Sequence, residues 1–171
     1  GLVVTATPRD ALMVATQDLH TQLDPDLIEA IVEKTGPDRA VWYGFIDLPR
    51  PVRDRHWLVE SWNNHALAVK TGGVSWEHPW RLIEDGEERV RPRIVAGSVP
   101  GVTLERLESA IYTPVNHGAW VMIALGDEVL LGYHATSVVG GAIPDWVGLR
   151  LAYSRLEGAI READSARQVA Q

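Results

Sequence analysis

Hydrophobic and polar positions repeat along the chain in two ways, one typical of strands and one typical of helices. Runs rich in branched and aromatic residues, bounded by Gly, Pro, Asn or Asp, predict β-strands at residues 1–7, 27–34, 39–47, 54–65, 68–77, 119–125 and 128–137. The last two runs flank Gly126-Asp127 and predict a hairpin. Because most strands follow one another without a helix between them, we expect a mostly antiparallel sheet.

Two amphipathic segments predict helices near the two ends of the chain. The first spans residues 8–18, with Thr7 as N-cap and Pro8 at the first helical position. The second spans residues 144–164 and opens at Pro144. Its apolar residues are spaced three and four apart, and we expect this stripe to face the sheet: Trp146, Leu149, Tyr153, Leu156, Ile160 and Ala163.

The middle of the chain, residues 78–107, shows neither period and contains several prolines and glycines. A structureless loop of this length is unusual in a compact domain and is often functional. We therefore expect a lid-like insertion, and a solvated insertion without function is the alternative.

Composition and charge narrow the function classes. The 171 residues suit one domain, 1–171, large enough to fold without a metal or disulfide. The net charge of −7 and the lack of a basic stripe argue against nucleic acid as a partner. No apolar run is long enough to span a bilayer, so we expect a soluble protein, cytoplasmic rather than exported. Because the chain begins at Gly1, we expect lead-in residues to be missing, and a removed export segment stays open.

No motif in the sequence predicts a metal, a cofactor or a nucleophile. The chain has no cysteine and no Gly-x-Ser-x-Gly, and no glycine-rich loop precedes a helix. His56 and Glu60 have a spacing that suits one helical face, but their segment is a predicted strand, where such residues lie about 13 Å apart. We therefore expect no cofactor, no metal and no catalytic residue.

Four stretches resemble a known family, the START-type domains of the helix-grip superfamily, which includes Bet v 1-like proteins and polyketide cyclases/aromatases. The stretches are VTATPRDALMVATQD (4–18), RAVWYGFIDLPRPVRDRHWLVE (39–60), SWEHP (75–79) and the segment 118–159 with its GGAIPDW. The second and fourth are the more specific. His56 departs from the family pattern, which often has an acidic residue there, and the segment after Pro79 is longer than usual.

The resemblance implies an α+β helix-grip fold, a curved antiparallel sheet wrapped around the long C-terminal helix with an apolar cavity between them. Seven tryptophans beside one phenylalanine suit either the wall of such a cavity or a thick core. The candidate ligand-binding residues are Trp42, Phe45, Trp57, Trp62, Trp76, Tyr112, Trp120, Met122, Tyr133, Trp146, Leu149 and Tyr153. Asp54 and Arg55 are either polar cavity contacts or a structural ion pair and turn cap.

The resemblance implies non-catalytic binding or transfer of a hydrophobic small molecule, of lipid, sterol or fatty acyl type. A cyclase/aromatase-type enzyme that uses the same cavity is the alternative, and a protein-interaction role is a third. The implied partners are the hydrophobic ligand and, transiently, a membrane. The oligomeric state stays open. In this family the loop corresponding to 78–107 packs near the C-terminal helix, so the lid would gate the cavity.

Overall fold

A computed structural model describes residues 2–4, 7–15, 27–144, 146–149, 153, 157–161, 164 and 165. The elements alternate between strands and short helices. They are β1 (Leu2–Val4), α1 (Pro8–Ala15), β2 (Leu27–Gly36), β3 (Arg39–Ile46), β4 (Arg55–Trp62), α3 (His65–Lys70), β5 (Ser75–Leu82), α4 (Gly86–Val95), α5 (Leu104–Ser109), β6 (Ile111–Tyr112), β7 (Val115–Leu125) and β8 (Glu128–Val138). No helix among these described residues is long and apolar enough to cross a membrane.

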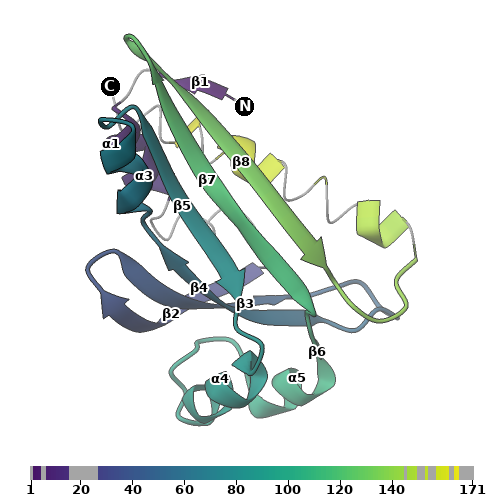
Figure 1. Cartoon of the computed structure of the whole chain (residues 1–171). Helices are drawn as coiled ribbons and strands as arrows, with labels where there is room; N and C mark the ends of the chain where they lie inside the picture. The colour runs from purple at the N-terminus through teal and green to yellow at the C-terminus, as the bar shows by residue number, and fades with distance from the viewer. Residues whose placement is uncertain are drawn as a thin grey trace.

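All eight strands of the described residues belong to one sheet. Seven of them follow the order β1-β8-β7-β5-β4-β3-β2 with antiparallel neighbours, and the short β6 pairs in parallel with β4. In Figure 1, β5, β7 and β8 run diagonally across the upper half, and β2, β3 and β4 cross below them. The predicted α+β class and mostly antiparallel sheet are therefore confirmed, as is the β7–β8 hairpin.

The strand register divides the side chains between two faces, because residues directly opposite on neighbouring strands share a face. We call inner face the side on which Trp120 and Met122 pack against Ala11 and Leu12 of α1 and against Ala159. The outer face packs against α4 and α5, which lie below β2, β3 and β4 in Figure 1. The core therefore has a layer on each side of the sheet.

The predicted strand 68–77 is wrong over its first half. Residues 65–70 form α3, and Asn64 caps it by accepting a hydrogen bond from the Leu67 amide at 3.2 Å. Gly72 and Gly73 follow with positive φ angles, and β5 begins only at Ser75. The helix is so short that its apolar residues complete no helical period, and the alternation of Leu67 and Val69 resembled a strand.

The expectation of a structureless lid over 78–107 is also wrong. Residues 78–82 complete β5, and α4 and α5 fill most of the remainder. These helices and their connection cover the outer face with buried apolar side chains: Val90, Ile94, Val99, Val102 and Leu107. Each helix buries at most three of its own residues, so neither shows a sustained apolar period in the sequence.

The C-terminal segment is helical at every described position between 146 and 165, but the predicted stripe does not face the sheet. Trp146, Leu149, Tyr153 and Ile160 are exposed, whereas Val147 and Ala159 are buried. Leu156 and Ala163 lie outside the described residues. Apolar residues also occur off the stripe, at Val147, Leu151, Ala152 and Ala159, so periodicity alone did not single out the buried face.

Candidate functional site

The inner face of the sheet carries a continuous row of aromatic side chains from β3 to β8. Trp42 on β3 lies opposite Val59, Trp57 on β4 opposite Gly44, and Trp120 on β7 opposite Tyr133. Tyr133 lies between two indoles, with ring centroids 5.5 Å from Trp80 in a stacked arrangement and 4.7 Å from Trp120 in a tilted one. Aromatic pairs at these distances add to the free energy of burial.

Trp80 joins the two halves of this face. It packs against the cluster around Trp120 and also against the cluster around Trp57. Its Nε1 donates a hydrogen bond to Oδ1 of Asn116 at 3.0 Å, which satisfies the one polar atom of the indole. Sequence analysis missed Trp80, because the predicted strand ended at residue 77. The alternation Trp76, His78, Trp80 was the available signal.

Two glycines give the indoles room to lie against neighbouring strands. A Cβ atom on Gly44 would clash with the Trp57 ring, and a Cβ atom on Gly118 would clash with the His134 carbonyl oxygen and with the Trp80 ring. Both positions lie on central strands, where glycine offers no side chain to pack. Their occurrence there follows from the close approach of the tryptophan rings.

The structure divides the twelve predicted ligand-binding residues among three places. The inner face holds half of them: Trp42, Trp57, Trp76, Trp120, Met122 and Tyr133. The outer side of the sheet holds Phe45, Trp62 and Tyr112. The C-terminal segment holds Trp146, Leu149 and Tyr153, all exposed. A one-residue shift in strand register exchanges the two faces, so the sequence did not separate the first two groups.

Trp62 and Phe45 contact arginines on the outer face, and Phe45 is also fully buried in the apolar cluster of that face. The guanidinium carbons of Arg39 and Arg81 each lie 5.5 Å from the centre of the Trp62 ring, and both arginines pair with Glu60. The guanidinium carbon of Arg106 lies 4.5 Å from the centre of the Phe45 ring. These are cation–π contacts that stabilise the outer surface.

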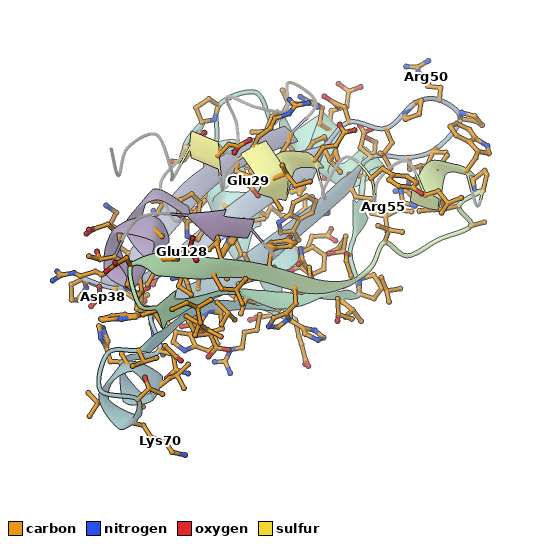
Figure 2. All side chains as sticks on the ribbon, turned by 90° about the horizontal axis from the view of Figure 1, so that it is seen from above. Glu29, Asp38, Arg50, Arg55, Lys70 and Glu128 are labelled. Atoms are coloured by element: carbon orange, nitrogen blue, oxygen red, sulfur yellow. The ribbon has the colours of Figure 1, made fainter. Side chains whose placement is uncertain are left out.

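Asp54 and Arg55 lie where β4 begins, at one end of the sheet. Asp54 accepts a hydrogen bond from the Leu48 amide at 2.9 Å, so it acts as a turn cap. The Arg55 side chain is almost fully buried and donates to main-chain carbonyl oxygens, and burial lowers its pKa. Figure 2 shows Arg55 and Arg50 at one end of the molecule and Asp38, Lys70 and Glu128 at the other.

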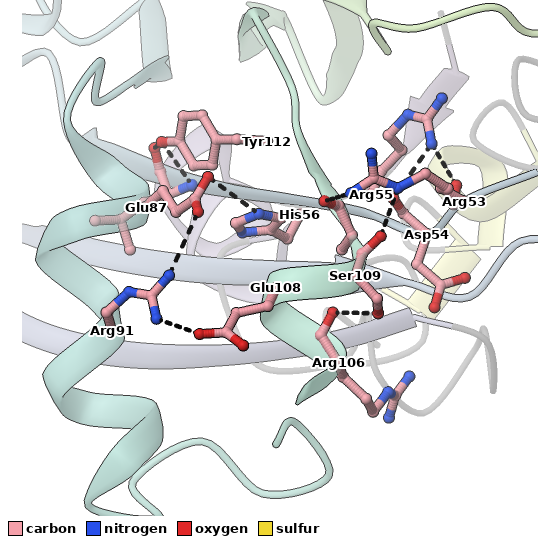
Figure 3. A network of polar contacts seen from close by, with 12 residues as sticks. Arg53, Asp54, Arg55, His56, Glu87, Arg91, Arg106, Glu108, Ser109 and Tyr112 are labelled. Carbon is pink, nitrogen blue, oxygen red and sulfur yellow. Dashed lines mark hydrogen bonds and ion pairs between the residues drawn. The ribbon is translucent and has the colours of Figure 1, made fainter. Parts of the chain in front are cut away.

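A small polar cluster lies between the outer face and α4. His56 and Tyr43 are fully buried, and among the described residues neither the His56 ring nitrogens nor the Tyr43 hydroxyl has a hydrogen-bond partner. Burial lowers the pKa of His56 to about 4 and raises the pKa of Tyr43. Figure 3 shows His56 directed at Glu87, whose carboxylate lies 3.9 Å from Nε2, too far for a hydrogen bond.

Tyr112 borders the same cluster, with its ring centroid 5.1 Å from that of His56. Unlike Tyr43, its hydroxyl is bonded: it donates to the Ile83 carbonyl at 2.5 Å and accepts from the Leu58 amide at 3.2 Å. Burial raises the pKa of Tyr112 to about 12. His56, Tyr43 and Tyr112 are therefore uncharged at neutral pH. Within the part of the chain described, no three His, Asp or Glu side chains are grouped to hold a metal ion.

Comparison with known proteins yields solved structures only. No family model and no curated protein matches the sequence. A STAR-related lipid transfer protein from Xanthomonas axonopodis superposes with a TM-score of 0.66 at 17% identity, covering 98% of this chain and 82% of that one. The chain has the helix-grip fold of START domains.

Two further solved structures extend this likeness. Human STARD10 superposes with a TM-score of 0.64 at 12% identity, covering 98% of this chain and 61% of that one. The Zhui aromatase/cyclase from Streptomyces sp. R1128 superposes with a TM-score of 0.52 at 15% identity, covering 95% of this chain and 90% of that one. The fold is thus shared by lipid-transfer proteins and by an enzyme, so the function has to be argued from the site.

Proposed function

We propose that this START-type domain binds a hydrophobic small molecule, of lipid, sterol or fatty acyl type, against the inner face of its sheet, and that it carries the ligand without transforming it. The observation that supports this proposal is the continuous aromatic layer of Trp42, Trp57, Trp80, Trp120 and Tyr133, in which Trp57 and Trp120 are buried and Tyr133 is exposed. Removing apolar ligand surface from water there gains about 25 cal/mol per Å².

The apolar side chains of the C-terminal segment add to the case for binding. Trp146, Leu149 and Tyr153 present large exposed apolar surface in a segment whose Ala159 packs on the inner face. Exposed apolar patches on a domain of this size commonly mark sites of interaction.

The inner face favours a carrier over a cyclase because its titratable groups are few. At described inner-face positions they include Glu29, Arg55 and His78, on three different strands. Arg55 is bonded to main-chain carbonyls, and Nδ1 of His78 lies 2.8 Å from Oδ1 of Asn63. General acid–base catalysis needs such groups within hydrogen-bonding reach of one reacting atom.

The test combines native mass spectrometry of the purified protein with titration of an NBD-labelled fatty acid, monitored through tryptophan fluorescence. We expect a co-purified lipid or saturable probe binding that a natural lipid displaces. Tyr133→Lys, at an inner-face position 37% exposed, should weaken probe binding, whereas Val69→Lys on α3, 81% exposed, should not. Equal affinity in wild type and Tyr133→Lys would place binding elsewhere. Conversion of a poly-β-ketone thioester to a cyclic product would establish the enzyme instead.

A further inference from the structure

A cavity opens on the outer face of the sheet, at the beginning of α4. Its volume is about 560 Å³, within the range of small-molecule sites. Tyr112 of β6 lines it together with charged residues of α4 and of the turn before it: Glu84, Asp85, Glu87, Glu88 and Arg91. Four carboxylates and one guanidinium give the lining a net negative charge. The aromatic layer lies on the opposite face, so this cavity is separate from the proposed site for a hydrophobic ligand.

The acidic residues have an ordinary role in the helix, and that role does not account for the whole site. Carboxylates in the first turn of a helix stabilise its positive end, as Glu87 and Glu88 do in α4. Among the described residues, however, Glu87 is the only one of the four acidic lining residues that forms ion pairs, with Arg91 at 3.8 Å and with His56 at 3.9 Å. The helix dipole explains the charge of the lining, but it does not explain the buried histidine beside it.

His56 lies directly behind the carboxylate of Glu87. Its side chain has no exposed surface, and neither ring nitrogen has a hydrogen-bond partner in the described part of the chain. Figure 3 shows the ring directed at Glu87, which lines the cavity. A buried polar atom without a partner costs free energy, and such an atom in a folded protein calls for a bound water, ion or ligand as its explanation.

The distance between His56 and Glu87 defines the group that can join them. Nε2 of His56 and Oε2 of Glu87 are 3.9 Å apart, so one donor atom at about 2.8 Å from each can bridge them. Burial lowers the pKa of His56 to about 4, so at neutral pH one ring nitrogen can accept a hydrogen bond, and the carboxylate only accepts. The bridging atom must therefore carry at least two hydrogens.

We propose that this cavity binds a small aliphatic di- or polyamine, with one ammonium group donating to Nε2 of His56 and to the carboxylate of Glu87. An ammonium group supplies both the hydrogens and the positive charge that the lining favours, whereas water supplies only the hydrogens. The cavity is larger than a single ammonium group, so a second one can reach the exposed carboxylates at its mouth: Glu84, Asp85 and Glu88. The Tyr112 hydroxyl is already bonded to Ile83 and Leu58, which leaves its ring for a cation–π contact.

The experiment titrates the full chain with spermidine at neutral pH and physiological salt, monitored by calorimetry and by the NMR resonances of the His56 ring. We expect saturable binding to one site, with a shift of the His56 ring resonances that saturates at the same concentration. Glu87→Gln should weaken the affinity about tenfold or more, because it removes a charge-assisted hydrogen bond. Glu105→Gln is the matched control: it removes the same charge from the first turn of α5, outside the cavity, and should change the affinity little.

His56→Leu separates a built site from general attraction to an acidic surface. It removes the acceptor and leaves the net charge unchanged at neutral pH, so it should also weaken the affinity about tenfold, with thermal unfolding as the check that the variant is folded. The site is disproved if spermidine does not saturate wild type. It is equally disproved if Glu87→Gln and Glu105→Gln lose the same affinity while His56→Leu loses none. Because the cavity and the aromatic layer lie on opposite faces, this titration gives its answer whether or not the fatty acid probe binds.

Discussion

At the scale of single residues, the polar cluster of His56, Tyr43 and Tyr112 shows how burial determines the protonation state of a side chain. His56 has no exposed surface and no hydrogen-bond partner in the described part of the chain, so its charged form loses solvation without a compensating hydrogen bond. Glu87 lies 3.9 Å away, but its side chain is 43% exposed and water screens its charge. Desolvation therefore dominates, and His56 stays neutral in the folded protein at neutral pH.

This burial predicts acid sensitivity. The pKa of His56 falls from 6.5 to about 4 on folding, so the unfolded chain binds the proton more tightly. The free energy of unfolding then decreases as the pH falls from about 6.5 to about 4. Below that range the full decrease is about 3 kcal/mol. His56→Leu should remove this loss, which urea unfolding at pH 7 and pH 4.5 measures. An identical pH dependence in wild type and variant would contradict the prediction.

The two tyrosines of the cluster form a matched pair. Tyr43→Phe deletes a hydroxyl that has no partner among the residues the structure describes, so the free energy of unfolding should stay equal or rise slightly. Tyr112→Phe deletes a hydroxyl that both donates and accepts, so the free energy should fall by about 1–2 kcal/mol. Chemical denaturation of both variants at neutral pH checks the contrast. A larger loss in Tyr43→Phe than in Tyr112→Phe would reveal an unseen partner of Tyr43.

At the scale of elements, the segment from β5 to β6 behaves as part of the core. Its helices α4 and α5 bury side chains against β3 and β4, and Arg91 of α4 pairs with Glu108 of α5 at 2.8 Å. An ion pair and a shared apolar layer hold the two helices together on the outer face. A gate at this place would have to break that layer.

Replacing residues 94–104 by a Gly-Ser linker should therefore unfold the protein or destabilise it strongly. The replacement removes Ile94, Val99 and Val102 from the outer-face core, and each deleted large apolar side chain costs about 1–4 kcal/mol. Circular dichroism and thermal unfolding of the shortened chain measure the effect. A shortened chain with an unchanged melting temperature would restore the lid interpretation.

The C-terminal segment offers a test of which helical face is buried. Val147→Asp places an unpaired charge at a position 1% exposed and should lower stability by several kcal/mol, on the order of 3. Leu149→Asp, two residues away and 59% exposed, should change it by about 0.5 kcal/mol or less. Thermal unfolding compares the two. The reverse order would show that the predicted apolar stripe faces the sheet.

At the scale of the whole molecule, the net charge determines how strongly the domain is attracted to charged membrane surfaces. The chain carries 16 basic and 23 acidic residues, a net charge of −7. Several of its arginines form ion pairs with carboxylates, as in Arg39–Glu60, Arg89–Glu33 and Arg91–Glu108. Long-range attraction to an anionic membrane is therefore weak.

Vesicle flotation should reflect this charge. We expect no more protein on vesicles that contain anionic phosphatidylglycerol than on neutral phosphatidylcholine vesicles, and lowering the salt concentration should not increase binding to the anionic vesicles. Binding that rises steeply with anionic lipid at low salt would reveal a local basic surface that dominates the net charge.

The sequence alone predicted the parts of this protein that depend on local pattern. Alternating apolar residues placed β2, β3, β4, β7 and β8, and the resemblance in four stretches predicted the helix-grip fold. The turn at Gly126-Asp127 placed the hairpin. These features follow from periodicity and turn chemistry, which act over a few neighbouring residues.

Only the tertiary structure decided which side chains share a surface. Trp62 and Trp80 are alike in the sequence, yet one lies between two arginines and the other joins the aromatic clusters of the inner face. Two of the carbonyls that accept hydrogen bonds from Arg55 belong to residues more than 80 positions away. The order and register of the strands bring such groups together. Both depend on pairing between segments that are distant in the sequence, which no local pattern encodes.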